Sequence, residues 1–136
     1  MSQEPDRPKR CVAEIQAGVA RDGCVTRKSL LLVETALPAF PSSAALWCLR
    51  GDLIQLSDDD DLYTLEDAGA SYERASVLES DNPEPFESLG HFYDAVMNDP
   101  LRAEPFFRRA LELGAGDSAR SGLAQVLDQL GRSGSA

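Results

Sequence analysis

Residues 85–113, PFESLGHFYDAVMNDPLRAEPFFRRALEL, decide the fold. Their apolar and small side chains recur at spacings of three, four and seven in two segments: Phe86, Leu89, Gly90 and Tyr93 in the first, then Ala103, Phe107 and Ala110. Such spacing puts each set on one face of an α-helix. The stretch therefore predicts a helical hairpin, with the sequence NDPL at residues 98–101 as its turn.

The same pattern returns along the chain. A small, an aromatic and a small residue, Ala68, Tyr72 and Ala75, repeat the spacing of the second segment. The interval between paired helices is also kept, since eleven residues separate Ala36 from Trp47, Ala75 from Phe86 and Ala110 from Ser121. Helical pairs that recur in phase bury their apolar stripes by stacking on one another. We therefore expect an array of hairpins.

Strand signals are nearly absent, so we expect an all-α protein. The spacing predicts seven helices, at residues 11–22, 26–37, 43–56, 64–80, 84–97, 102–113 and 118–131. Asn82 followed by Pro83 is typical of a helix start, and Asp117 is expected to cap the last helix. We expect one domain over residues 11–131, with flexible tails at 1–10 and 132–136.

These motifs resemble the tetratricopeptide repeat (TPR), in which an aromatic, a Leu-Gly pair and a tyrosine precede the small–aromatic–small helix. Residues 85–113 match well, whereas the preceding repeat has Arg50 in place of leucine and Ile54 in place of tyrosine. The first repeat is degenerate, and residues 118–132 resemble the closing half-repeat of such arrays. The resemblance covers residues 11–131 and implies a TPR-like solenoid of about three repeats plus a C-terminal capping helix.

Charge is spread unevenly along the chain. The net charge is −10, and residues 52–99 hold fourteen acidic side chains against the single Arg74. So acidic a surface does not favour nucleic acid, whose phosphates it would repel. The sequence has no apolar segment of membrane-spanning length and no apolar leader after its charged start, so we expect a cytoplasmic protein that binds no membrane. We also expect a protein of bacterial type.

Three features could carry chemistry, and each has a simpler interpretation. The single histidine, His91, has no nucleophile or metal ligands at a useful spacing, so we expect neither catalysis, cofactor nor metal. The sequence GAGDSA at residues 114–119 lacks the strand that a dinucleotide-binding turn follows, and Gly114 is expected to end a helix. The four aspartates at residues 58–61 lack the glycine and glutamate of a calcium loop; they fit an enlarged turn, with weak adventitious cation binding as the alternative.

The first helices of stacked hairpins line the concave side of such an array. Residues displaced by about one position from the stripe that faces the partner helix should face this groove. In the second repeat these are Cys48, Asp52, Gln55 and Leu56, and in the third they are Glu84, Glu87, His91 and Asp94. The groove is therefore expected to be acidic, with Asp52, Gln55, Glu84, Glu87, His91 and Asp94 as its binding residues.

We expect a non-enzymatic adaptor that binds a basic peptide or protein through this groove. The carboxylate-clamping basic residues of the best-known TPR grooves are replaced here by acids, which disfavours that ligand class. One alternative is a chaperone or immunity-type neutraliser of a basic client. Others are a metal-dependent enzyme centred on His91, a merely solvated acidic face, and weak self-association through the last helix, whose apolar residues are Leu123, Val126, Leu127 and Leu130.

Overall fold

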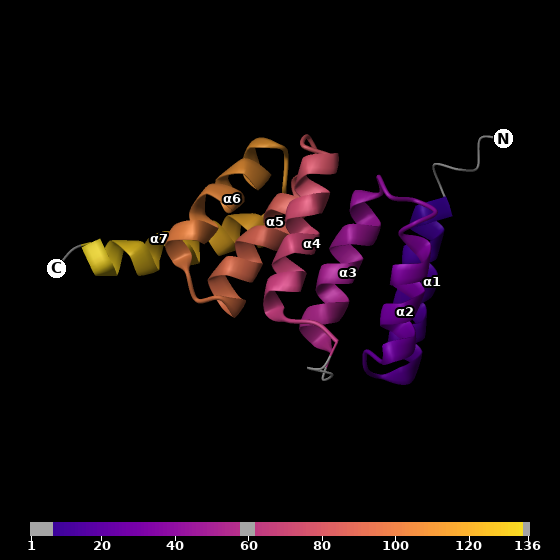
Figure 1. The fold of residues 1–136 in the computed structure, drawn as a ribbon. Coiled ribbons are helices and arrows are strands. Elements are labelled where there is room, and N and C mark those ends of the chain that lie inside the picture. The colour runs from indigo at the N-terminus through magenta and orange to yellow at the C-terminus, as the bar shows by residue number, and fades with distance from the viewer. Residues whose placement is uncertain (1–6, 58–61, 135–136) are drawn as a thin grey trace. The chain divides into compact units, whose positions relative to one another are not determined.

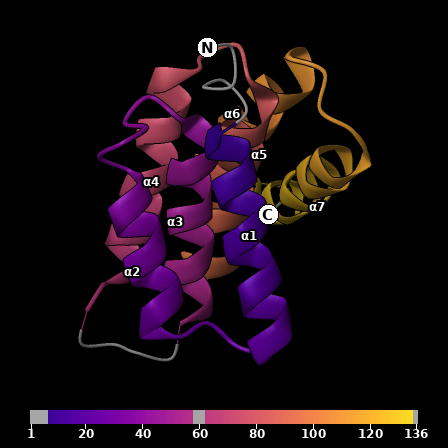
Figure 2. The ribbon, with the colours of Figure 1, turned by 90° about the vertical axis from the view of Figure 1, so that its right-hand side faces the viewer.

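The computed structural model describes residues 7–57 and 62–134, with side chains described up to Gly131 (Figures 1 and 2). All regular structure in these residues is helical, which confirms the all-α prediction. The elements are α1 (Arg7–Asp22), α2 (Arg27–Ala36), α3 (Ala44–Leu56), α4 (Leu65–Leu78), α5 (Pro83–His91), the π-helical turn η2 (Phe92–Val96), α6 (Pro100–Glu112) and α7 (Asp117–Gly134). No helix among them is long and apolar enough to cross a membrane.

The chain divides into two compact units. The N-terminal unit, Met1–Leu78, holds α1 to α4, and the C-terminal unit, Glu79–Ala136, holds α5 to α7. In the N-terminal unit, α3 packs against α4 as well as against α1 and α2 (Figure 2). In the C-terminal unit, α6 packs against α5 and α7. The expected single domain over residues 11–131 stays a prediction.

The first helix begins earlier, and the last helix ends later, than expected. α1 begins at Arg7, so residues 7–10 of the predicted tail are helical. Pro8 does not prevent this, because the N–H groups of a first helical turn have no intrahelical partner and proline loses nothing there. α7 runs to Gly134, past the predicted end at residue 131.

The hairpin turn of the C-terminal unit is tighter than the expected NDPL turn. Asp99 caps α6, its carboxylate accepting from the backbone N–H of Arg102 at 3.2 Å, so the helix begins at Pro100 rather than near residue 102. Pro105 therefore lies inside α6 and has no N–H for the carbonyl of Leu101. Leu101 is 70% exposed, so water reaches this turn and limits the cost.

The helix predicted at residues 84–97 ends in a π-helical turn. The N–H of Met97 donates to the carbonyl of Phe92 at 3.0 Å, a bond that spans five residues, and Asn98 adopts a positive φ of 53°. Asparagine tolerates this left-handed conformation better than most residues. The extra residue in the turn lets the chain reverse within Asn98 and Asp99 before α6 begins.

The other predicted helix signals are mostly correct. The side chain of Asn82 accepts from the N–H of Glu84 at 3.0 Å, and Pro83 is the first residue of α5. Gly114 follows the end of α6 with a φ of 101°. Asp117 was expected to cap α7 but is its first residue, where the carboxylate pairs with Arg120 at 2.6 Å.

The same packing contact occurs inside each of the hairpins α3–α4 and α5–α6, which confirms the repeat assignment. A Cβ added to Gly51 of α3 would stand 2.7 Å from the ring of Tyr72 on α4, and one added to Gly90 of α5 would stand 2.6 Å from the ring of Phe107 on α6. No real Cβ comes so close to a ring, so only glycine lets these helices approach. The alanines that flank each ring are fully buried: Ala68, Ala75, Ala103 and Ala110.

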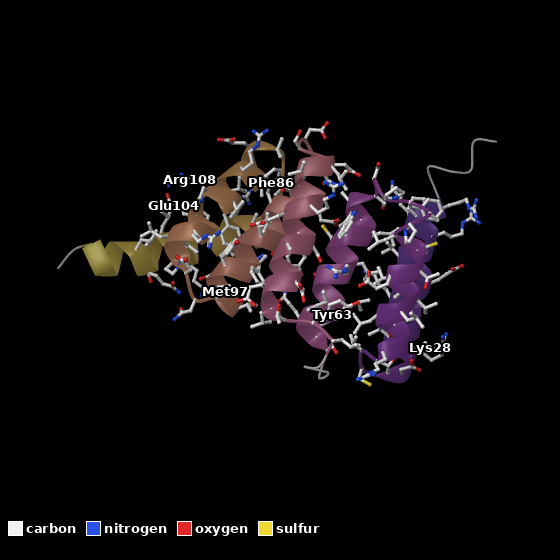
Figure 3. All side chains as sticks on the ribbon, viewed as in Figure 1. Lys28, Tyr63, Phe86, Met97, Glu104 and Arg108 are labelled. Carbon is white, nitrogen blue, oxygen red and sulfur yellow. The ribbon has the colours of Figure 1, made fainter. Side chains whose placement is uncertain are left out.

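Arg50, the departure from the TPR pattern, lies in a polar cluster between α2, α3 and α4. Its Nε donates to Glu34 at 3.1 Å, and its Nη1 donates to the buried Ser71 hydroxyl at 2.7 Å. The Tyr63 hydroxyl donates to the same Glu34 oxygen, and the Tyr63 ring lies 5.1 Å from the guanidinium (Figure 3). This cluster replaces an apolar contact with a network of charged and polar partners. Ile54, the other departure, is simply buried.

Candidate functional site

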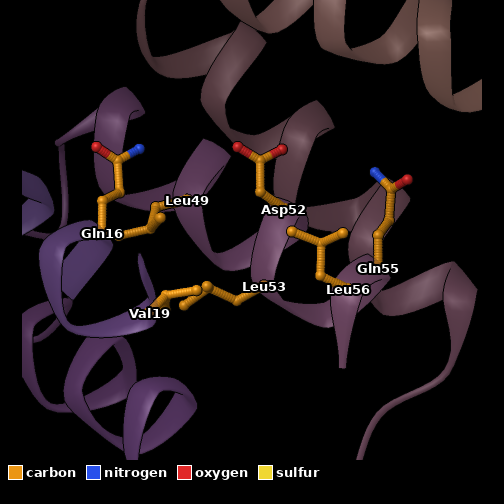
Figure 4. Close-up of a pocket in the computed structure, with 7 residues that line it drawn as sticks. All are labelled: Gln16, Val19, Leu49, Asp52, Leu53, Gln55 and Leu56. Carbon is orange, nitrogen blue, oxygen red and sulfur yellow. The ribbon is translucent and has the colours of Figure 1, made fainter. Parts of the chain in front are cut away.

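The N-terminal unit contains a pocket of about 320 Å³ between α1 and α3 (Figure 4). Two residues of α1 and five of α3 line it: Gln16, Val19, Leu49, Asp52, Leu53, Gln55 and Leu56. The α3 residues fall at positions 49, 52–53 and 55–56, about one helical turn apart, so they form one face of that helix. Gly51 lies on another face, against α4, which leaves this one for the pocket.

The pocket combines an apolar lining with polar walls. Leu49 and Leu53 are only 3% and 2% exposed and form its fixed base, whereas Leu56 is 66% exposed. Gln16, Asp52 and Gln55 bring the polar groups, and Asp52 carries the one charged side chain of the lining (Figure 4). An apolar cavity with a few polar groups is the usual form of a binding site.

The Tyr72 hydroxyl joins two of these polar groups from behind. It donates to Asp52 Oδ1 at 2.5 Å and accepts from Gln55 Nε2 at 2.6 Å. Tyr72 is 1% exposed. Burial, and next the negative charge of Asp52, raise the pKa of Tyr72 well above its ordinary value of 10.0. The hydroxyl therefore keeps its proton at neutral pH and serves as a permanent donor to Asp52.

The polar groups of the pocket lining are one carboxylate and two side-chain amides. No thiol or hydroxyl nucleophile is among its lining residues, and Asp52 is the one acid there. An apolar base with a carboxylate on its wall fits a long side chain with an aliphatic stem and a cationic head. Across the part of the chain that the structure describes, no three His, Cys, Asp or Glu side chains are grouped to hold a metal ion.

Six groove residues were predicted, and Asp52 and Gln55 are the two that line this pocket together. Leu56, also expected to face the groove, lines it too. Cys48 does not: it is 5% exposed and belongs to the core, although it lies one turn before Asp52 on the same side of α3.

The other four predicted residues belong to the C-terminal unit. His91 Nε2 lies 3.0 Å from the Ser118 hydroxyl on α7 and 3.8 Å from a carboxylate oxygen of Glu87, and the His91 ring meets that of Phe107 edge-on. Serine and glutamate thus approach the same ring nitrogen, whereas a catalytic triad places them on opposite nitrogens. His91 joins α5 to α7 in this arrangement.

Glu84 and Asp94 lie at the two ends of the same helical segment. Glu84 is exposed in the first turn of α5, and Asp94 is half-buried in η2. Glu87 is half-buried in the turn between them. The acids at residues 58–61 lie outside the described residues.

Sequence reasoning missed Gln16, Val19 and Tyr72. The first two lie in the degenerate first repeat, where no motif fixed the register. Tyr72 was assigned to packing alone, although its difference from Phe107 at the same place in the next repeat was a usable signal.

The apolar face predicted for self-association is partly closed. Val126 is fully buried within the C-terminal unit, because α7 packs on α6 there, while Leu127 is 39% exposed. Leu123 and Leu130 are half-buried. Charged side chains on the neighbouring α6, such as the Glu104–Arg108 pair at 2.8 Å (Figure 3), are intramolecularly paired.

No protein-family model matches the chain, and no curated protein matches it. Among solved structures, the chain is similar to the Sgt2 TPR domain from Aspergillus fumigatus, with a TM-score of 0.78 and 20% sequence identity. The match covers 94% of this chain and 82% of the other. At this identity the likeness concerns the fold, and the chain has the TPR-like helical repeat fold that its sequence predicted.

Proposed function

We propose that this TPR-like chain is a non-enzymatic protein-interaction module whose α1–α3 pocket takes a basic side chain of a peptide or protein partner. The observation that carries the proposal is the position of Asp52, an exposed carboxylate and the one charged group on the wall of a largely apolar pocket. The aliphatic stem of a lysine or arginine would pack on Leu49 and Leu53, and its head would pair with Asp52.

The size of the pocket limits what enters it. About 320 Å³ is near the lower end of the range for small-molecule sites, roughly 300–1,000 Å³. One or two side chains fill such a volume. The partner would therefore present an extended segment in which a basic residue stands beside an apolar one, and the exposed Leu56 would cover the apolar neighbour.

The net charge supports a basic partner. At −10, the chain attracts cationic surfaces over several ångströms and raises their association rate, an effect that salt weakens. Glu84, Glu87 and Asp94, with His91 among them, would add to this attraction from the C-terminal unit. The pocket provides the specific contact, and the distributed negative charge raises the rate of association.

A peptide-display selection tests the proposal. Wild-type protein should enrich sequences with lysine or arginine next to a leucine-like residue, and D52K should lose that enrichment because it puts a cation against a cation. E66K is the matched control, since Glu66 is an exposed acid of the same unit outside the pocket. Equal enrichment of basic peptides by D52K and wild type would refute the assignment. D52N, which keeps the shape, guards against a folding effect of lysine.

A further inference from the structure

The two hairpins place different aromatic residues at one equivalent position. Tyr72 lies over Gly51 and Phe107 lies over Gly90, each flanked by two fully buried alanines. Both rings are essentially inaccessible, at 1% and 0% exposure. The contacts with the glycine and the alanines are alike at the two positions, and the Phe107 ring additionally lies against Gly122 of α7. A phenyl ring therefore satisfies the shared contacts, and the tyrosine hydroxyl is not required for them.

The hydroxyl instead contacts the pocket wall. Its two hydrogen bonds, 2.5 Å to Asp52 Oδ1 and 2.6 Å from Gln55 Nε2, link side chains that stand three residues apart on α3. Asp52 is exposed and Gln55 half-exposed, so neither is fixed by packing. A buried hydroxyl that bonds to both restricts their rotamers.

We infer that Tyr72 is a positioning residue: its hydroxyl holds the Asp52 carboxylate and the Gln55 amide in one arrangement, so that the pocket selects a cationic side chain over a neutral one of equal shape. This inference rests on the proposed function. Pre-organised polar groups bind more tightly because little freedom is lost on binding.

The chemistry of Tyr72 supports this role. Burial and the charge of Asp52 raise its pKa, so the hydroxyl stays protonated wherever the protein would meet a partner. The donor to Asp52 is therefore constant. Selection by the pocket then does not depend on the protonation of Tyr72 at neutral pH.

The chain offers a matched control at Tyr63. Its hydroxyl also donates to a carboxylate, that of Glu34, in the same unit. Neither Tyr63 nor Glu34 lines the pocket. Both Y63F and Y72F remove a hydroxyl that donates to a carboxylate. The Tyr63 hydroxyl lies away from the pocket, whereas the Tyr72 hydroxyl lies behind the pocket wall.

The experiment uses two capped peptides as probes, leucine–lysine–leucine and leucine–norleucine–leucine, which differ in one charge. Affinities of the full chain are measured by NMR titration for wild type, Y72F, Y63F, D52N and the double variant D52N/Y72F. Wild type should prefer the lysine peptide. Y72F should lower affinity for that peptide about three- to tenfold and leave the norleucine peptide unchanged, while Y63F should change neither.

The double variant separates positioning from structure. If Tyr72 acts through the Asp52 charge, Y72F should cost nothing further once Asp52 is replaced by asparagine. An equal loss in both backgrounds, or a loss for both peptides, would assign Tyr72 a purely structural role and overturn the inference. A lysine preference that D52N abolishes and Y72F preserves would also overturn it, while leaving the proposed function intact.

A readout without peptide completes the test. The Gln55 side-chain amide protons should exchange with water more slowly in wild type and Y63F than in Y72F, because the bond from Gln55 Nε2 to the Tyr72 hydroxyl protects them. An unchanged Gln55 exchange rate in Y72F would contradict the positioning role. If wild type shows no lysine preference and D52N has no effect, the proposed function fails, and the claim of selectivity fails with it.

Discussion

The ring of Tyr72 lies against Gly51 so closely that an added Cβ would stand 2.7 Å from its carbons. This contact joins the two helices of the second hairpin, and Gly90 with Phe107 repeats it in the third. Both glycines follow the aromatic of their first helix by four residues, Trp47 or Phe86. Each hairpin thus depends on one glycine and one aromatic ring that meet across its two helices.

Gly51→Ala should destabilise the protein by about 1–3 kcal/mol, because the methyl group forces Tyr72 or the helix backbone to move. Urea denaturation monitored by circular dichroism measures the change. Gly18→Ala is the control: the nearest atom to a Cβ at Gly18 is a side-chain nitrogen of Arg21, 3.6 Å away. It should be neutral or gain up to about 1 kcal/mol from the helix preference of alanine. A Gly51→Ala protein as stable as wild type would contradict the packing described.

Arg50→Leu restores the residue usual in the repeat, yet we expect it to destabilise the protein by about 1–3 kcal/mol. It leaves Glu34, whose side chain is 33% exposed, and the buried Ser71 hydroxyl without the guanidinium. Adding Glu34→Leu should recover most of the loss, because both charges are then gone. Thermal melts of the two single variants and the double variant give the coupling. If the double variant loses as much stability as the sum of the Arg50→Leu and Glu34→Leu losses, the ion pair contributes little.

Pro105→Ala should stabilise the protein by about 1–2 kcal/mol. Alanine supplies the N–H that Pro105 lacks and removes the clash of its ring with the preceding turn, against a smaller gain in unfolded-state entropy. Chemical denaturation measures the change. Pro100→Ala is the control, because Pro100 occupies the first helical position, where the N–H has no partner. A loss of stability in Pro105→Ala would mean that the proline is needed for the turn.

The free energy of unfolding should fall above pH 10 partly because of Tyr72. Its pKa is raised on folding, so the unfolded chain loses this proton first and is favoured as pH rises. The contribution is complete below the ordinary value of 10.0 and declines above it, by up to about 1.4 kcal/mol per pH unit for one group. Chemical denaturation at pH 9 to 11 should show that the free energy of unfolding falls less steeply with pH in Y72F than in wild type. Parallel declines in the two proteins would contradict the burial of this hydroxyl.

Much of the fold follows from sequence because its signals are local and repeated. The small–aromatic–small helices, the Asn82 cap and the Gly114 stop each depend on a few neighbouring residues. The start of α6 was missed because the Asp99 cap outweighed the cost of Pro105 inside the helix. The π-helical turn has no sequence signature of its own. The ends of a helix depend on competing local effects, such as a capping side chain against an internal proline. The sequence therefore predicts helix ends less well than it predicts the helices themselves.

The candidate site follows from sequence only in part. Helical spacing predicted that Asp52 and Gln55 share a face of α3, and both residues line the pocket there. It did not show that α1 supplies Gln16 and Val19, because the pairing of a degenerate repeat depends on tertiary packing. Cys48 lies in the same helical stripe as Asp52, yet it is buried in the core, because one turn along α3 this stripe passes from the pocket wall into the packed interior.

The most direct test is a two-dimensional NMR titration of the isotope-labelled chain with the capped leucine–lysine–leucine peptide. We expect saturable shifts at Gln16, Val19, Asp52, Gln55 and Leu56, weakened by salt and absent in D52K. Shifts that avoid these residues, or that are identical with the norleucine peptide, would contradict a basic-side-chain site in the α1–α3 pocket.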